Sequence, residues 1–388
     1  MTVTSAQGFR AAGVRAGIKK SGNPDLALVI NDGPRDVVSG VFTSNRFKAA
    51  PVLWSQQVVA DGQARVVVLN SGGANACTGP EGFADTHRTA EHVAQVLHAM
   101  GSDIGAGDVA VCSTGLIGER LPMEKVLAGV ESAAGALSDD GGADAAVAIM
   151  TTDSVPKTAH VTTGGFTVGG MAKGAGMLAP ALATMLVVIT TDADISVADA
   201  QMALREATSV SFDRIDSDGC MSTNDTVLLL ANGASGTSPG IDAFTHALAQ
   251  VCTDLARQLI GDAEGATKDI AISVTDAAST EDALEVARAI SRSNLLKCAI
   301  HGQDPNWGRV LSAMGTTSAR FEPDQVDVSI NGIWVCRGGG IGDDRNLIDM
   351  AGREVSIDVR LNAGAKTATV WTNDLTAEYV HENSAYST

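Results

Sequence analysis

Hydrophobic and polar positions alternate along the chain in two patterns. Runs rich in β-branched residues, such as 64–70 and 108–112, predict buried strands, and each ends in a turn of small residues. Stretches of helical period follow; in residues 81–101 apolar side chains recur at 83, 93, 96, 97 and 100 before a Gly. The same strand-turn-helix order returns at 108–137, 183–212 and 270–293. The last of these helices has Ser279 or Thr280 as its predicted N-cap. We therefore expect layers of mixed α/β structure.

The C-terminal part of the chain has a different pattern. Polar and apolar residues alternate in 325–336, 353–360 and 366–374, and short Gly or Asn turns separate them. This predicts a smaller, strand-rich α/β lobe at about 280–388. No low-complexity linker precedes it, so we expect the lobe to pack against the rest of the chain.

Composition narrows the class of function. The 388 residues are 45% hydrophobic and 19% charged, as in an ordinary globular protein, and the formal net charge is −18. A nucleic acid or an anionic membrane requires a basic face, and the chain has no run of Lys or Arg. The N-terminus has no apolar signal segment, and no run approaches the roughly 20 apolar residues of a membrane span. We expect a cytoplasmic protein with small-molecule substrates.

Motifs for metals and common cofactors are missing from the sequence. The six Cys residues form no C-x-x-C pair and are predicted to be buried free thiols. The seven His residues form no H-E-x-x-H motif, and there is neither a G-x-S-x-G elbow nor a nucleotide-binding Gly loop. We predict no metal and no cofactor.

Two small-residue segments could carry chemistry. The turn CSTGLIG (112–118) follows a strand and precedes a predicted helix, so its N–H groups could stabilise an oxyanion beside a helix N-terminus. A tight turn with a capping hydroxyl is the simpler interpretation. Lys173 lies in the flexible, largely apolar segment TVGGMAKGAGM, where a solvated loop lysine is the simpler alternative.

Thr184 is a lone hydroxyl at the start of a buried strand, in KGAGMLAPALATML (173–186). A hydroxyl without a His partner becomes a nucleophile if cleavage makes it the first residue of a chain, because its own α-amine can act as the base. Cleavage after Ala183 would expose it in this way. From these residues alone, a structural Thr is the simpler interpretation.

Six motifs together resemble the ArgJ family of ornithine acetyltransferases (glutamate N-acetyltransferases). They occur in the family's order over nearly the whole chain: CSTGLIG, MTTD (150–153), GGMAKGAGMLAP-ALATML, DAEGATK (262–268), DPNWGR (304–309) and ENSAYST at the C-terminus. Ala175 and Ala181 depart from the family pattern, which has Ser and Asn there. The resemblance implies a layered α-β-β-α sandwich of the self-processing ArgJ/DmpA-like type.

The resemblance also implies an activity. The chain would cleave itself between Ala183 and Thr184 into an α chain, 1–183, and a β chain, 184–388. Thr184 would then carry the acetyl group from N2-acetyl-L-ornithine to L-glutamate in a ping-pong cycle of arginine biosynthesis, without a cofactor. Whether acetyl-CoA is a second donor stays open. The fragments would remain together in a heterotetramer of two α and two β chains.

Site residues follow from the motifs. Thr114 and Gly115 would stabilise the oxyanion, and the implied substrate contacts are Thr151, Lys173, Thr184, Glu264, Asn383 and Thr388. Lys173 suits an α-carboxylate and Glu264 suits an amine. Two other functions stay open: an amidase or aminopeptidase of the same fold type, which would use water as acyl acceptor, and an amino-acid-binding protein that never cleaves itself.

Overall fold

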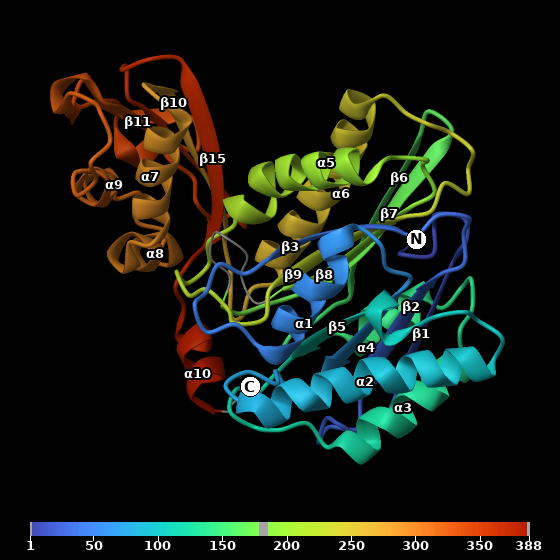
Figure 1. The fold of residues 1–388 in the computed structure, drawn as a ribbon. Coiled ribbons are helices and arrows are strands. Elements are labelled where there is room, and N and C mark those ends of the chain that lie inside the picture. The colour runs from blue at the N-terminus through green and yellow to red at the C-terminus, as the bar shows by residue number, and fades with distance from the viewer. Residues whose placement is uncertain (1, 178–184, 386–388) are drawn as a thin grey trace.

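The computed structural model describes residues 2–177 and 185–385, which form a two-sheet body and a smaller C-terminal lobe (Figure 1). One sheet of the body has the order β1-β2-β4-β5, with only β4 and β5 parallel. The other has the order β3-β9-β8-β7-β6, with only β8 and β9 parallel. Their strands are β1 Phe9–Val14, β2 Leu26–Asn31, β3 Val37–Phe42, β4 Val66–Ser71, β5 Val109–Thr114, β6 Lys157–Thr163, β7 Phe166–Lys173, β8 Leu186–Thr191 and β9 Thr226–Ala231.

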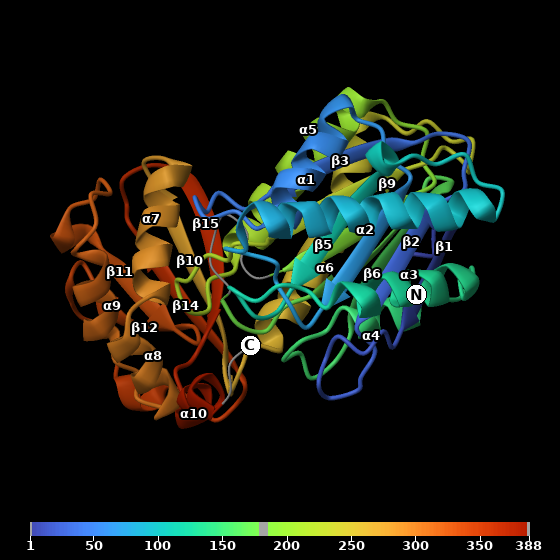
Figure 2. The same ribbon diagram turned by 60° about the horizontal axis from the view of Figure 1, so that its bottom comes forward.

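The body has four layers, as predicted, because each sheet is apolar on both faces. Leu69, Met171 and Val188 belong to the core between the two sheets. Helices α2 and α3 cover the outer face of the first sheet, and α5 and α6 cover that of the second (Figures 1 and 2). The helices of the body are α1 Ala50–Val58, α2 Gly79–Ala99, α3 Met123–Gly135, α4 Gly142–Ala148, α5 Val197–Val210 and α6 Ile241–Gly261.

A six-stranded sheet forms the C-terminal lobe, with the order β13-β12-β11-β14-β10-β15 and helices packed against it. The predicted cap of its first helix is confirmed, since the Ser279 side chain accepts the N–H of Asp282. The lobe contains β10 Asp269–Ala277, α7 Thr280–Ser291, α8 Asn294–His301, α9 Trp307–Met314, β11 Asp327–Ile330, β12 Ile333–Arg337, β13 Gly340–Ile341, β14 Glu354–Arg360 and β15 Lys366–Asn373.

Helix α10, Ala377–Ala385, leads from the lobe back to the body (Figure 1). Gly265, which follows α6, allows this approach: its φ is +63°, and a Cβ there would lie 2.3 Å from the Tyr379 nitrogen. Short 3₁₀ segments complete the described structure: η1 Val59–Asp61, η2 Ala106–Asp108, η3 Phe212–Arg214, η4 Pro323–Gln325 and η5 Arg345–Leu347. No helix in the described ranges is long and apolar enough to cross a membrane.

Two expectations about local structure are wrong. The helix after CSTGLIG begins only at Met123, after a loop that contains Gly115 and Gly118 at positive φ and ends at Pro122, so no helix N-terminus adjoins the turn. The six cysteines are free, but three of them are exposed, because two lie in loops and one on an outer helix face: Cys77, Cys220 and Cys298.

Strand register brings distant segments to one edge of the body. In the second sheet Lys173 pairs with Leu186, and Leu186 pairs with Thr226. In the first sheet Thr114 ends β5 beside the end of β4. Since Lys173 and Thr114 form a hydrogen bond, the two sheet edges meet there.

Candidate active site

A cavity of about 180 Å³ lies where these two sheet edges meet α10 and the loops before β9 and after α6. Six of the residues predicted from the motifs line it, although they come from five separate segments of the chain. The lining residues are Ala74, Thr114, Gly115, Ile117, Thr151, Thr152, Lys173, Gly176, Met177, Asp218, Cys220, Ser222, Thr223, Asn224, Glu264, Tyr379 and Asn383.

Lys173 is a buried cation at the end of β7, with 1% of its surface exposed. Its Nζ donates a hydrogen bond to Thr114 Oγ1 at 3.2 Å. Burial lowers the pKa of Lys173, and the carboxylates of Asp153, Asp225 and Glu264 act in the opposite direction. The alternative of a solvated loop lysine is therefore wrong, and an anionic ligand in the cavity would offset the cost of burying this charge.

Asp153, the last residue of MTTD, holds the backbone around this lysine. Its Oδ1 accepts Lys157 Nζ at 2.5 Å and the Gly174 N–H at 2.7 Å, and its Oδ2 accepts the Thr151 N–H at 2.9 Å. Burial alone would raise the pKa of Asp153, but Lys173 and Lys157 outweigh it and lower that pKa to about 2. The ionised carboxylate thus fixes the backbone of Thr151, a predicted substrate contact, and of Gly174, which follows Lys173.

This pKa gives a prediction for stability. A carboxyl whose folded pKa is below its unfolded value of about 3.9 stabilises the fold above that pH and loses this contribution as the pH falls toward about 2. We expect Asp153→Asn to remove a pH-dependent contribution of about 2 kcal/mol. Urea unfolding from pH 2 to 7, in a Thr184→Ala background to keep one chain, measures it, with exposed Asp324→Asn as control. A parent-variant difference that is constant over this range would contradict the assignment.

The turn after β5 presents two donors to the cavity. The Gly115 N–H forms no hydrogen bond within the described ranges, whereas the Thr114 carbonyl accepts the N–H groups of Gly72 and Gly73. Gly115 has a φ of +130°, and a Cβ there would lie 2.5 Å from the Gly73 nitrogen, so this position requires glycine. Thr114 Oγ1 already accepts a hydrogen bond from Lys173, which leaves its own hydrogen free to donate.

Glu264 and Asn383 also line the cavity. Asn383 Nδ2 donates to Glu264 Oε2 at 2.9 Å, and the Glu264 N–H donates to the Ala175 carbonyl at 2.9 Å. A Cβ at residue 176 would lie 2.7 Å from Glu264 Oε2, so a glycine here lets the backbone at residue 176 pass close to this carboxylate. The C-terminal helix and the loop after α6 therefore build one wall of the cavity.

The loop before β9 also lines the cavity, and none of its residues was predicted from the sequence. Asp218 accepts the Met177 N–H at 2.8 Å and the Cys220 N–H at 3.0 Å, and burial raises its pKa. Tyr379 lies near Asp218, and burial together with that carboxylate raises the pKa of Tyr379 to about 12. The polar run 216–225 directly before an apolar strand was the available signal.

Three predicted residues, Ala183, Thr184 and Thr388, lie outside the described residues. Their roles stay predictions. Along the chain, the described residues that flank this segment are Met177, which lines the cavity, and Met185, which is buried just before β8.

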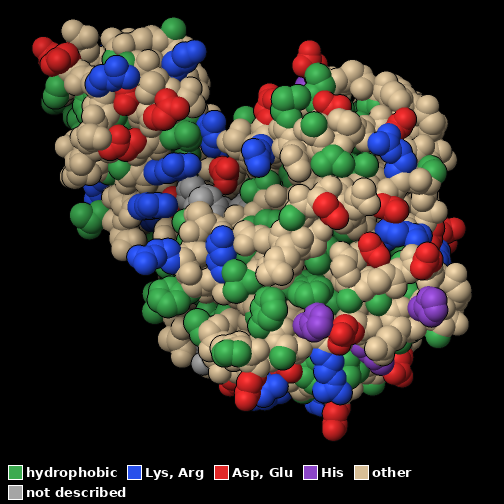
Figure 3. All heavy atoms as spheres, in the orientation of Figure 1, with side chains coloured by type: hydrophobic (Ala, Val, Ile, Leu, Met, Phe, Trp, Pro, Cys, Tyr) green, Lys and Arg blue, Asp and Glu red, His purple; other side chains and the backbone are tan. Residues whose placement is uncertain are grey.

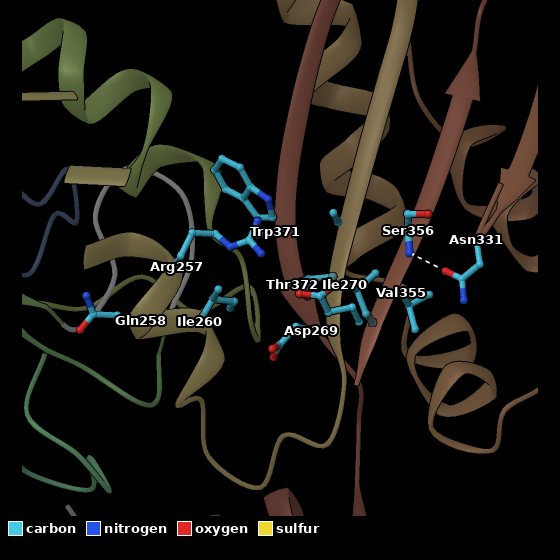
Figure 4. Close-up of a pocket in the computed structure, with 12 residues that line it drawn as sticks. Arg257, Gln258, Ile260, Asp269, Ile270, Asn331, Val355, Ser356, Trp371 and Thr372 are labelled. Atoms are coloured by element: carbon cyan, nitrogen blue, oxygen red, sulfur yellow. Dashed lines mark hydrogen bonds between the residues drawn. The ribbon is translucent and has the colours of Figure 1, made fainter. Parts of the chain in front are cut away.

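A larger pocket of about 610 Å³ lies between α6 and the sheet of the lobe (Figure 4). Arg257 lies over Trp371 there, 5.4 Å from the ring centroid, and Asp269 pairs with Arg353. The Ser356 N–H donates to Asn331 Oδ1 (Figure 4). The surface is also visibly hollowed between the lobe and the body (Figure 3). This pocket contains none of the predicted residues and no buried cation, so we place the chemistry in the smaller cavity.

Comparisons with known proteins match the whole chain. A model described as "ArgJ family" matches residues 10–388. The "Arginine biosynthesis bifunctional protein ArgJ" of Streptomyces coelicolor is 67% identical over 387 residues, which cover 100% of both chains. The protein of the same name from Thermobifida fusca is 62% identical over 388 residues, again with 100% of both covered.

Among solved structures, the chain is similar to an ornithine acetyltransferase from Mycobacterium tuberculosis complexed with ornithine. The two are 60% identical, with a TM-score of 0.46, and the match covers 48% of this chain and 96% of that one.

Proposed function

The chain belongs to the ArgJ family, and from this premise we propose how its cavity transfers an acetyl group from N2-acetyl-L-ornithine to L-glutamate in arginine biosynthesis. The main support for this proposal is that six of the predicted residues line one cavity, which also contains the buried side chain of Lys173. The experiment that tests it is the Lys173 substitution described below.

Self-cleavage comes first in this proposal. The Thr184 hydroxyl attacks the Ala183 carbonyl, the peptide C–N bond breaks as the nitrogen takes up a proton, and water hydrolyses the resulting ester. The products are 1–183, with a new carboxylate, and 184–388, with a free Thr hydroxyl and α-amine. Cleavage would not separate the fragments, because β3, β6 and β7 of the first and β8 and β9 of the second share one sheet.

Acetyl transfer then uses the new terminus. The Thr184 amine, with a reference pKa of about 7.7–8.0, takes the hydroxyl proton as the oxygen attacks the acetyl carbonyl. The Gly115 N–H and the Thr114 hydroxyl stabilise the oxyanion. Ornithine leaves with its amine protonated, and the α-amine of glutamate attacks the acetyl ester to regenerate Thr184 and release N-acetylglutamate.

Recognition uses the groups that both substrates share. Each carries an α-carboxylate, for which Lys173 is the buried cation of the cavity, with Thr151 beside it. Glu264 and Asn383 face the amine end, and Thr388 completes the predicted set. The side chains differ in charge, since ornithine's is a cation and glutamate's an anion, so Glu264 serves the two half-reactions unequally.

We expect Lys173→Met to weaken both half-reactions together. A lost charge-assisted hydrogen bond costs about 1.5–3 kcal/mol, or roughly a ten- to hundredfold fall in kcat/KM. The measurement is kcat/KM for acetylornithine and for glutamate in processed protein. Lys268→Met is the matched control, because Lys268 is also buried but donates to the Met350 and Gly352 carbonyls in the lobe.

Values within about twofold of the parent for both substrates would show that Lys173 does not bind the α-carboxylate. Glu264→Gln should separate the half-reactions. We expect it to lower kcat/KM for acetylornithine more than for glutamate, and an equal fall in both would contradict the role given to Glu264.

We propose three further properties on the same basis. Acetyl-CoA serves as a second acetyl donor, which would make this enzyme an amino-acid N-acetyltransferase as well; the word "bifunctional" in the names of the relatives supports this. Two α and two β chains form a heterotetramer. The enzyme works in the cytoplasm.

A further inference from the structure

We propose that Asp218 is a specificity-determining residue of the cavity: its carboxylate binds the side-chain ammonium of ornithine while Lys173 binds the α-carboxylate. This inference rests on the proposed function, and it names the partner of the ornithine side chain within that same site. Asp218 belongs to the loop before β9 and lines the cavity, but none of the sequence motifs contains it.

The charges around the cavity are complementary to ornithine. Three of the described lining residues are charged: the cation Lys173 and the carboxylates Asp218 and Glu264. Free ornithine carries the opposite set, one carboxylate and two ammonium groups. Glutamate carries two carboxylates and one ammonium group, so it leaves one of the acidic residues without a partner. The lining therefore fits ornithine better than glutamate, and one carboxylate is available for the ornithine side chain.

Asp218 and Glu264 lie on successive residues of one backbone stretch. A Cβ at residue 176 would lie 2.7 Å from Glu264 Oε2, and the Met177 N–H donates to Asp218 Oδ2 at 2.8 Å. Tyr379 is close to both carboxylates, since each of them contributes to its raised pKa. The two acidic groups are thus neighbours in the cavity, although 46 positions separate them in the sequence.

Of the two, Glu264 has the stronger interaction with Lys173. It is among the charges that act most on that lysine, and Asp218 is not. Lys297 and Asp216 act on Asp218 instead. In an amino acid the α-amine is one carbon from the α-carboxylate, whereas the ornithine ammonium is at the far end of the side chain. Glu264 therefore suits the α-amine, and Asp218 suits the side-chain ammonium.

Contacts with the lobe hold the loop that carries Asp218. Arg292 Nε donates to Asp216 Oδ2 at 2.7 Å, and Lys297 Nζ donates to the Ser217 carbonyl. The carboxylate of Asp218 is itself fixed, because each of its oxygens accepts a backbone N–H group. Asp218 is therefore held in place before a ligand enters, as a residue that selects between substrates requires.

Burial supports the same assignment. It raises the pKa of Asp218, and the N–H groups of Cys220 and Met177 oppose this. Within residues 2–177 and 185–385, no Lys, Arg or His side chain forms an ion pair with Asp218. An ammonium group of the substrate would supply that cation and would make a charge-assisted hydrogen bond with the carboxylate.

The test uses N2-acetyl-L-norvaline, which is acetylornithine without the side-chain amine. We expect the parent to prefer acetylornithine by a ten- to hundredfold higher kcat/KM, the usual worth of a charge-assisted hydrogen bond. Asp218→Asn should remove most of this preference by lowering kcat/KM for acetylornithine alone. The value for glutamate should stay at or above that of the parent, because the lost carboxylate repels the glutamate side chain. Steady-state kinetics on processed protein measure all three.

Two variants serve as controls. Asp218→Glu keeps the charge and should keep most of the preference for acetylornithine. Asp216→Asn removes a carboxylate from the same loop, but Asp216 pairs with Arg292 and does not line the cavity, so the preference should equal that of the parent. If Asp218→Asn is not cleaved, Asp218→Ser replaces it, because its hydroxyl oxygen can still accept a backbone N–H.

A parental preference in processed Asp218→Asn would overturn the proposal, as would an equal loss in Asp216→Asn or a parent that does not distinguish the two donors. A loss in Glu264→Gln but not in Asp218→Asn would give the side-chain ammonium to Glu264. All these outcomes leave the proposed function intact. A parent that forms no N-acetylglutamate from acetylornithine is a separate result, and it would refute the proposed function itself.

Discussion

Thr184→Ala is expected to leave the protein as a single 388-residue polypeptide without measurable acetyl transfer. The same hydroxyl is the attacking group in cleavage and in transfer, so its loss removes both reactions. Losing the nucleophile of a comparable enzyme lowers kcat by about 10⁶-fold, the largest effect we expect from any substitution here. A denaturing gel and an acetylornithine-glutamate assay measure the two outcomes.

Thr184→Ser is the control for this experiment. It keeps a hydroxyl at the same position, so the chain should still be cut and should retain part of its transfer activity. A Thr184→Ala protein that is still cleaved at the Ala183-Thr184 bond would show that another group attacks that carbonyl.

Thr114→Ala should lower kcat by about 10²–10³-fold, as the removal of one oxyanion donor typically does. The Thr114 hydroxyl lines the cavity and has its hydrogen free, because its oxygen accepts a bond from Lys173. The donor acts on charge that develops during the reaction, so KM for acetylornithine should change much less than kcat. Steady-state kinetics on processed enzyme separate the two constants.

Two controls test the assignment to this hydroxyl. Thr114→Ser keeps the donor and should retain most of the activity. Ser113→Ala removes the adjacent buried hydroxyl, which donates to Asn70 Oδ1 at 2.6 Å within the first sheet, and should leave kcat unchanged. A Thr114→Ala enzyme with a raised KM and the parental kcat would make Thr114 a binding residue instead.

Local patterns predicted the layers of the fold because strand and helix periodicities depend on which faces are buried. The run 186–191 is buried at every position, and a strand between two apolar layers needs no alternation. The start of α3 at Met123 agrees with the apolar spacing, but the expected helix N-terminus beside CSTGLIG was wrong, because a loop with Gly115 and Gly118 at positive φ separates the turn from the helix.

The motifs named six residues that line one cavity, but they did not indicate the other residues around it. Lys173, Glu264 and Asn383 are far apart in sequence, and only strand register and the return of α10 bring them to one cavity. The burial of Lys173 could not be predicted, because the Gly-rich composition of its segment is typical of an exposed loop. Asp218 was missed because a polar run before a strand is typical of ordinary loops.

The most direct test of the central claim is to locate the acetyl group on the enzyme. Processed protein is incubated with acetylornithine in the absence of glutamate, quenched in acid, and its two fragments are analysed by intact mass and peptide mapping. We expect one acetyl group on the fragment that begins Thr184-Met185-Leu186, attached at Thr184 and removed when glutamate is added before the quench. An acetyl group on another residue, or steady transfer to glutamate with no acetylated fragment in a single turnover, would contradict it.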